Sequence, residues 1–172
     1  MIEAKLLGRN AIGVDINSEA VKLSNTNLNF TCQEKSKIFT KQGNASNLSF
    51  IKNASIDLIC THPPYADIIR YSEKISGDIS HLKYEEFLRE LEQIAGESYR
   101  VLKKGGICAF MIGDMRKKGY VLPLGMSSMQ KFVHTGFKLK EIIIKEQHNC
   151  KSAEYWENIE KAFLMLAHEY IF

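Results

Sequence analysis

Two prolines and a tyrosine follow an apolar segment near the middle of the chain. The segment 56–61 reads IDLICT, and His62, Pro63, Pro64 and Tyr65 come directly after it. Because proline has a fixed φ and no N–H, such a corner leaves backbone carbonyls free to accept hydrogen bonds from an exocyclic amine. The tyrosine ring can stack on a planar base. The alternative is a strand-ending turn whose tyrosine packs in the core.

Two polar side chains have the types expected of a nucleoside-binding pair. Asp15 ends a short apolar run, where a carboxylate can accept hydrogen bonds from both hydroxyls of a ribose. Asn44 follows a later apolar run, and its amide offers a donor and an acceptor to an adenine edge. Ile16 and Ala45 would lie beside the same nucleoside. The alternatives are a helix cap shared by Asp15 and Asn17, and a plain Gly-Asn turn.

A short basic cluster, formed by Arg116, Lys117 and Lys118, follows another apolar run at 107–112. The chain as a whole is only weakly basic, with a net charge of +3, which by itself does not indicate nucleic acid. The cluster is a candidate for phosphate contacts if the fold places it beside the corner at 62–65. Otherwise it is a solvated surface turn.

The elements that must position these residues alternate between strands and helices. The patterns predict helices at 2–8, 18–28, 84–102 and 123–135, and strands at 11–16, 37–41, 56–61, 107–112, 137–145 and 162–170. The fold class predicted is therefore α/β: a Rossmann-like, doubly wound, mostly parallel sheet with an antiparallel pair at its C-terminal edge. In such sheets ligands bind outside the carboxyl ends of the strands, which brings all the candidate residues to one side.

Composition narrows the class of protein further. The 172 residues suit one domain, and 45% hydrophobic with 25% charged residues is ordinary for a soluble fold. No apolar run reaches the roughly 18–20 residues of a membrane span. The four cysteines are widely spaced, so we expect no disulfide framework and no zinc or other metal site, and a reducing cytoplasm as the setting. Cys60 and Cys108 lie in apolar runs and are expected to be buried.

Four stretches carry a resemblance to a known family. They read LGRNAIGVDINSEAV (7–21), QGNASNL (42–48), DLICTHPPYADIIRYS (57–72) and SYRVLKKGGICAFMIGD (98–114). The chain resembles the S-adenosylmethionine-dependent DNA amino-methyltransferases that modify adenine N6 or cytosine N4. The resemblance implies that Asp15 holds the cofactor ribose, that Asn44 faces its adenine, and that 62–65 is the catalytic corner.

The implied reaction is methyl transfer to the exocyclic amine of a base flipped out of DNA. His62 and the Pro63 carbonyl would accept the amine hydrogens, and Tyr65 would stack on the base. His62 stands where the family usually has Asp, Asn or Ser, so the target remains cytosine N4 or adenine N6. The alternatives are a tRNA guanine-N2 methyltransferase and an inactive or split fragment.

The family's first strand and glycine-rich turn, which precede a helix equivalent to 2–8, have no counterpart in the sequence. We therefore expect a single methyltransferase-like domain over 1–172, truncated at its N-terminus relative to the family. The missing strand would lie between the strands that end at Asp15 and Thr61. Since unpaired buried backbone groups cost about 1–3 kcal/mol each, the sequence predicts a complementing N-terminal chain or a homo-oligomer as partner.

Overall fold

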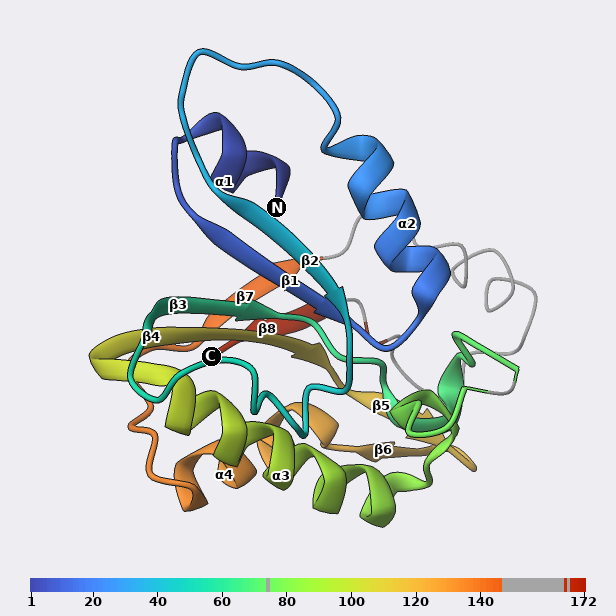
Figure 1. The fold of residues 1–172 in the computed structure, drawn as a ribbon. Coiled ribbons are helices and arrows are strands. Elements are labelled where there is room, and N and C mark those ends of the chain that lie inside the picture. The colour runs from blue at the N-terminus through green and yellow to red at the C-terminus, as the bar shows by residue number, and fades with distance from the viewer. Residues whose placement is uncertain (74, 147–165, 167) are drawn as a thin grey trace.

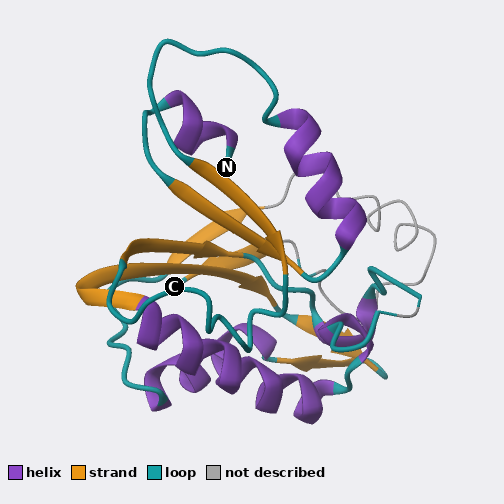
Figure 2. Cartoon of the chain, viewed as in Figure 1, coloured by secondary structure: helices purple, strands orange, loops and turns teal. Residues whose placement is uncertain are grey.

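The strands of the computed structural model (Figures 1 and 2) form two larger groups and one short hairpin. The structure describes residues 1–73, 75–146, 166 and 168–172. The first group contains α1 (Ile2–Leu6), β1 (Ala11–Asp15), α2 (Ser18–Asn27) and β2 (Ile38–Gln42). β1 and β2 pair in parallel along their whole length. The Thr40 hydroxyl donates to the Asn25 side chain, which fixes α2 on one face of this pair.

The second group is a four-stranded sheet in the order β3-β4-β8-β7. Its strands are β3 (Ile56–Thr61), β4 (Leu102–Gly113), β7 (Ile143–Glu146) and β8 (His168–Ile171). β3 and β4 are parallel, whereas β8 is antiparallel to both β4 and β7. The remaining elements are η1 (Ala66–Ile68), η2 (Ile79–His81), α3 (Tyr84–Val101), the hairpin of β5 (Met115–Lys117) and β6 (Tyr120–Leu122), and α4 (Leu124–His134). The predicted α/β fold with an antiparallel edge pair is confirmed.

The main core lies between the four-stranded sheet and the helices α3 and α4, which cover one of its faces (Figure 1). Its fully buried side chains include Phe87 and Leu91 of α3, Phe110 and Ile112 of β4, and Leu124 of α4. Burial of an apolar side chain of this size contributes about 1.5–3 kcal/mol. This packing holds the carboxyl ends of β3 and β4 in fixed positions.

β1 and β3 each leave one edge without a strand partner in the described part of the chain. β1 pairs only with β2, and β3 only with β4. Large apolar side chains on both strands are exposed: Ile12 at 43% and Leu58 at 57%.

Two strands, β4 and β7, begin well away from the predicted positions, whereas most other boundaries differ by only one or two residues. α3 ends at Val101, and β4 begins at once with Leu102, so the Lys-Lys-Gly-Gly stretch expected to close the helix belongs to the strand. The reason is pairing with β3, since Leu102 lies opposite Ile56 and the Lys103 ammonium contacts Asp57 at 2.7 Å. The strand predicted at 137–145 covers only Ile143–Glu146.

Three further comparisons with the sequence concern short segments and a cysteine. The β5–β6 hairpin was not predicted, although Lys118 and Gly119 both take positive φ, as a two-residue hairpin turn requires. The last predicted strand is described only at His168–Ile171, and its residues 162–165 and 167 lie outside the described residues. Cys60 is exposed, contrary to expectation, because the face of β3 that carries it is not covered by α3 and α4.

The described helices include none that is both long and apolar enough to cross a membrane.

Candidate active site

A cavity of about 450 Å³ lies at the carboxyl ends of β1, β2 and β3. Seven of the predicted site residues line it: Asp15, Ile16, Asn44, Ala45, His62, Pro63 and Pro64. They come from three separate strand ends, which meet because the strands run in the same direction. Tyr65 and the basic cluster at 116–118 do not line the cavity.

Asp15 has a structural bond as well as a place in the cavity. Its Oδ1 accepts the backbone N–H of Asn17 at 2.8 Å, and the Asn17 side chain in turn accepts the N–H of Glu19 at 2.9 Å as the N-cap of α2. The cap interpretation is therefore correct for Asn17. Among the described residues no donor contacts Asp15 Oδ2, so that oxygen is available to a ligand.

Asn44 is oriented by its own turn. Its side-chain oxygen accepts the N–H of Ser46 at 2.9 Å, which leaves the amide N–H₂ as the recognition group. Gly77 packs against that amide from the segment that follows the proline corner. A Cβ on Gly77 would lie 3.0 Å from Asn44 Nδ2 and 3.2 Å from the Ile16 side chain. Residues 71–72 and 77–79 thus close one side of the cavity.

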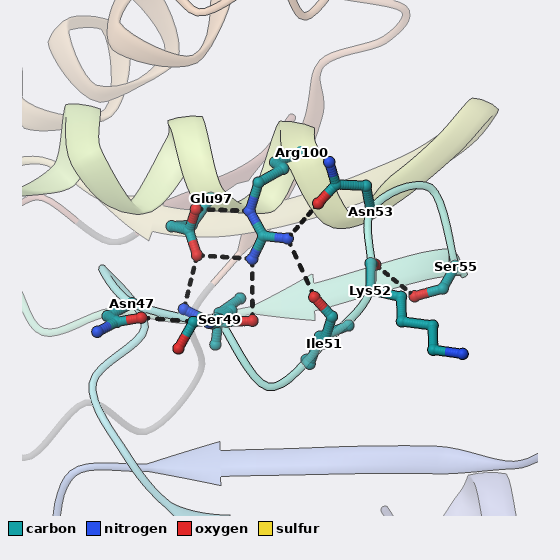
Figure 3. A network of polar contacts seen from close by, with 9 residues as sticks. Asn47, Ser49, Ile51, Lys52, Asn53, Ser55, Glu97 and Arg100 are labelled. Carbon is teal, nitrogen blue, oxygen red and sulfur yellow. Dashed lines mark hydrogen bonds and ion pairs between the residues drawn. The ribbon is translucent and has the colours of Figure 1, made fainter.

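An ion pair on α3 fixes the loop that carries Asn44 (Figure 3). The Arg100 guanidinium donates to the carbonyls of Leu48 and Ile51 at 2.9 and 3.0 Å and to the Asn53 side chain at 2.6 Å. Glu97 pairs with Arg100 at 2.7 Å and accepts the Leu48 N–H at 2.6 Å. The Arg100 hydrogen bond holds the pKa of Glu97 below its usual value. We call this set of contacts between Glu97, Arg100 and the loop the brace. The sequence pattern does not reveal it, because Glu97 and Arg100 have the spacing of ordinary solvent-exposed residues on the polar face of a helix.

A second wall of the cavity also escaped sequence analysis. Ser72 donates to Asp78 Oδ2 at 2.6 Å, and Asp78 Oδ1 accepts the Ser80 N–H at 2.8 Å. Burial raises the pKa of Asp78, but these hydrogen bonds outweigh it and keep the pKa below its usual range. The only signal in the sequence is the Asp-Ile-Ser cap of a short helix, which says nothing about a cavity.

The proline corner is connected to the far edge of the sheet. His62 Nε2 lies 3.0 Å from the Tyr65 hydroxyl, and Tyr65 donates a hydrogen bond to Glu169 on β8. Lys145 of β7 contacts the other oxygen of Glu169 at 2.6 Å. Burial, followed by the hydrogen bond to Glu169, raises the pKa of Tyr65 well above its usual value. The Tyr65 ring packs over Gly113, where a Cβ would come within 3.0 Å of it.

The basic cluster lies on the β5–β6 hairpin. Lys117 pairs with Asp67 at 2.8 Å, and this bond lowers the pKa of Asp67. Arg116 donates to the Gly119 carbonyl at 2.9 Å, and Lys118 is exposed at the turn. The hairpin is therefore tied through Lys117 to the segment that follows the corner.

A family model described as DNA methylase matches residues 56–172, which include the corner, α3 and the four-stranded sheet. The chain belongs to the DNA methylase family. Among its relatives are an orphan methyltransferase, M.BamHII of Bacillus amyloliquefaciens, and a type II methyltransferase, M.MjaVI of Methanocaldococcus jannaschii. M.BamHII is 27% identical over 66% of this chain, and M.MjaVI is 30% identical over 65% of it. The matches span 39% and 56% of the relatives, so the chain corresponds to about half of their length.

Solved structures of methyltransferases share this fold. A putative DNA modification methylase of Thermus thermophilus, solved with S-adenosyl-L-methionine, matches with a TM-score of 0.54 and 28% identity over 75% of this chain and 49% of its own. The cytosine-N4-specific PvuII DNA methyltransferase has a TM-score of 0.60 and 22% identity over 75% of this chain and 45% of its own. A methyltransferase of Methanosarcina mazei aligns with 99% of this chain and 83% of its own at 17% identity and a TM-score of 0.59. The predicted Rossmann-like methyltransferase fold is thus confirmed.

Proposed function

We propose that this chain is the catalytic part of an S-adenosylmethionine-dependent methyltransferase that modifies the exocyclic amine of a DNA base. The observation that carries the proposal is one cavity that joins Asp15 and Asn44 to the corner of His62, Pro63 and Pro64. These are the groups needed to bind a nucleoside and an amine side by side. Membership in the DNA methylase family supports the same reaction.

The residues present fit the cofactor. Asp15 Oδ2 would accept from the ribose hydroxyls, and the Asn44 amide would donate to the adenine. A cavity of about 450 Å³ falls within the roughly 300–1,000 Å³ of small-molecule sites. When bound, S-adenosylmethionine would supply a sulfonium-bound methyl group, whose bond to sulfur breaks as a bond to the amine nitrogen forms.

The corner would orient the amine. A neutral His62 and the Pro63 carbonyl would each accept one amine hydrogen, which directs the nitrogen lone pair toward the methyl group. This is catalysis by position, so no covalent nucleophile is required. The nitrogen releases one proton after the transfer, to His62 or to water. Exposed Cys60 has no role in this scheme.

The test is transfer of labelled methyl groups into DNA or tRNA, followed by digestion to nucleosides. Label in N4-methylcytosine or N6-methyladenine supports the proposal and identifies the base. Label in a tRNA guanine would overturn the choice of substrate. His62→Ala and Asp15→Ala should abolish transfer, whereas Lys35→Ala, an exposed change away from the cavity, should not.

We propose in addition that the active form contains one more strand between β1 and β3. Both strands end at the same cavity and therefore run in the same direction, and each has a free edge in the described part of the chain. The occupant is an apolar strand of about five or six residues, the lengths of β1 and β3, parallel to both. It would come from a further polypeptide segment, since the chain matches only about half of its relatives.

Hydrogen exchange tests this added strand. Co-expression with the segment that precedes the corresponding region in a relative should protect amides of both β1 and β3 and should restore calorimetric binding of S-adenosylmethionine. Protection of only one strand, or of neither, would contradict the proposal. A concentration-dependent rise in mass with the same protection would instead identify a second copy of this chain as the partner.

The described cysteines are free thiols, which fits a cytoplasmic setting.

A further inference from the structure

Glu169 is a buried carboxylate next to the proline corner, and no part of the proposed reaction uses it. It is 4% exposed and lies on β8, opposite Gly113 of β4 and Lys145 of β7 in the sheet register. A buried charge requires a partner, and the Lys145 ammonium supplies the opposite charge at 2.6 Å. The other carboxylate oxygen accepts from the Tyr65 hydroxyl. Glu169 thus joins the antiparallel edge of the sheet to the corner.

Counting protons along this chain of contacts defines the state of His62. A tyrosine hydroxyl has one hydrogen, and Tyr65 donates it to Glu169. In its contact with His62 Nε2, which lies 3.0 Å away, the Tyr65 oxygen can therefore act only as an acceptor. Nε2 must then carry a hydrogen. In a neutral imidazole the other ring nitrogen, Nδ1, is left as the acceptor.

We propose that Glu169 is a positioning residue that acts through Tyr65: it fixes the Tyr65 hydroxyl and commits His62 Nε2 to donate, so that His62 Nδ1 accepts a hydrogen of the target amine. This inference rests on the proposed methyl transfer. It explains how a histidine serves at the first position of the corner, since Nδ1 then presents the single lone pair that the amine needs. The same bond fixes the ring of Tyr65, whose one edge packs over Gly113.

A purely structural role for Glu169 would have other consequences. As a link between β8 and β7 it would act through Lys145, and loss of the carboxylate would lower stability. Glu169 Oε1 also lies 3.5 Å from His62 Nε2, so loss of the carboxylate by itself does not separate the two roles. Removal of the Tyr65 hydroxyl alone leaves both the Glu169–Lys145 pair and the 3.5 Å approach of Glu169 Oε1 to His62 Nε2 in place. The positioning role, which acts through Tyr65, predicts that this removal changes the hydrogen on His62. The two roles are therefore separable by one oxygen atom.

The first experiment is NMR of the imidazole rings in ¹⁵N-histidine-labelled chain, at a pH where His62 is neutral, with its signal assigned by His62→Gln. In the parent chain His62 should be held as the Nε2–H form, with a ring proton protected from exchange with water. In Tyr65→Phe, and in Glu169→Leu if it folds, the ring should become a mixture of forms with fast proton exchange. The matched control Tyr99→Phe, on α3 away from the corner, should resemble the parent.

A parent ring protonated at Nδ1, or identical His62 signals in the parent and Tyr65→Phe, would overturn the inference. This readout needs no methyl transfer, so it stands apart from the proposed function.

If the active complex transfers methyl groups, kcat should fall about 10- to 100-fold in Tyr65→Phe with KM for the cofactor unchanged. Tyr65→Phe combined with Glu169→Leu should be no worse than the more damaging single change, because the two act as one unit. Full activity of Tyr65→Phe would refute positioning even where DNA methylation is confirmed.

Discussion

Lys117 and Asp67 join the β5–β6 hairpin to the segment directly after the proline corner, with Nζ 2.8 Å from Oδ2. The pair connects the element that carries the basic cluster to η1, directly after the candidate catalytic corner. It also means that the charge of Lys117 is partly neutralised before any nucleic acid arrives. The cluster is therefore a surface whose affinity for phosphates depends on an acidic neighbour.

We expect Asp67→Asn to strengthen DNA binding, because it removes one negative charge and releases Lys117 to contact a phosphate. The slope of log K against log salt should become steeper by about one unit. Fluorescence anisotropy with a labelled duplex at several salt concentrations measures this. The matched control is Asp57→Asn, which breaks the ion pair between Asp57 of β3 and Lys103 of β4. Equal slopes for the two variants would show that the hairpin does not face DNA.

Acid should weaken the brace that holds the Asn44 loop. The pKa of Glu97 is lowered in the folded chain by Arg100, so its contribution to stability is complete above the pKa of the unfolded state, about 4.3. That contribution disappears as pH falls through the lower folded value. Urea unfolding between pH 7 and pH 3 should give a shallower loss of stability in Glu97→Gln than in the parent.

The same brace predicts a functional effect. Arg100→Gln should lower Tm by a few degrees and weaken S-adenosylmethionine binding, because the carbonyls of Leu48 and Ile51 lose their donor. Lys131→Gln, which breaks a comparable ion pair between α4 and α3, should change Tm but not cofactor affinity. Equal affinity in both variants would contradict the link between the brace and Asn44.

Local patterns predicted the strand ends correctly, and with them the meeting of Asp15, Asn44 and His62. This succeeded because parallel strands necessarily bring their carboxyl ends together. The sequence did not reveal the roles of Glu169 and Gly77. Both reach the site because the chain turns back toward it, and hydrophobic periodicity does not predict such turns. The Lys-Lys-Gly-Gly stretch was misplaced because strand pairing with Ile56 overrides the propensity for a helix end.

Cysteine reactivity should report which face of β3 is open. Cys60 is exposed, whereas burial raises the pKa of Cys108 to about 12. Since the thiolate is the nucleophile, iodoacetamide at pH 8 should alkylate Cys60 in the native chain and Cys108 only after denaturation. Peptide mass spectrometry locates the label. Protection of Cys60 in the native chain would show that this face is covered.

Gly77 offers the sharpest test of how the cavity is closed. It has φ of +85°, and an added Cβ would lie 3.0 Å from Asn44 Nδ2. Gly105 has a similar φ of +79° but nothing within 4 Å of its Cβ position, so Gly105→Ala carries the backbone strain alone. Both substitutions should cost about 1–2 kcal/mol in urea unfolding. Only Gly77→Ala should displace the Asn44 amide and weaken S-adenosylmethionine binding, by about tenfold for a loss of 1.4 kcal/mol. If the two variants bind the cofactor equally well, residues 77–79 do not close over the nucleoside, and Asn44 loses its assigned role.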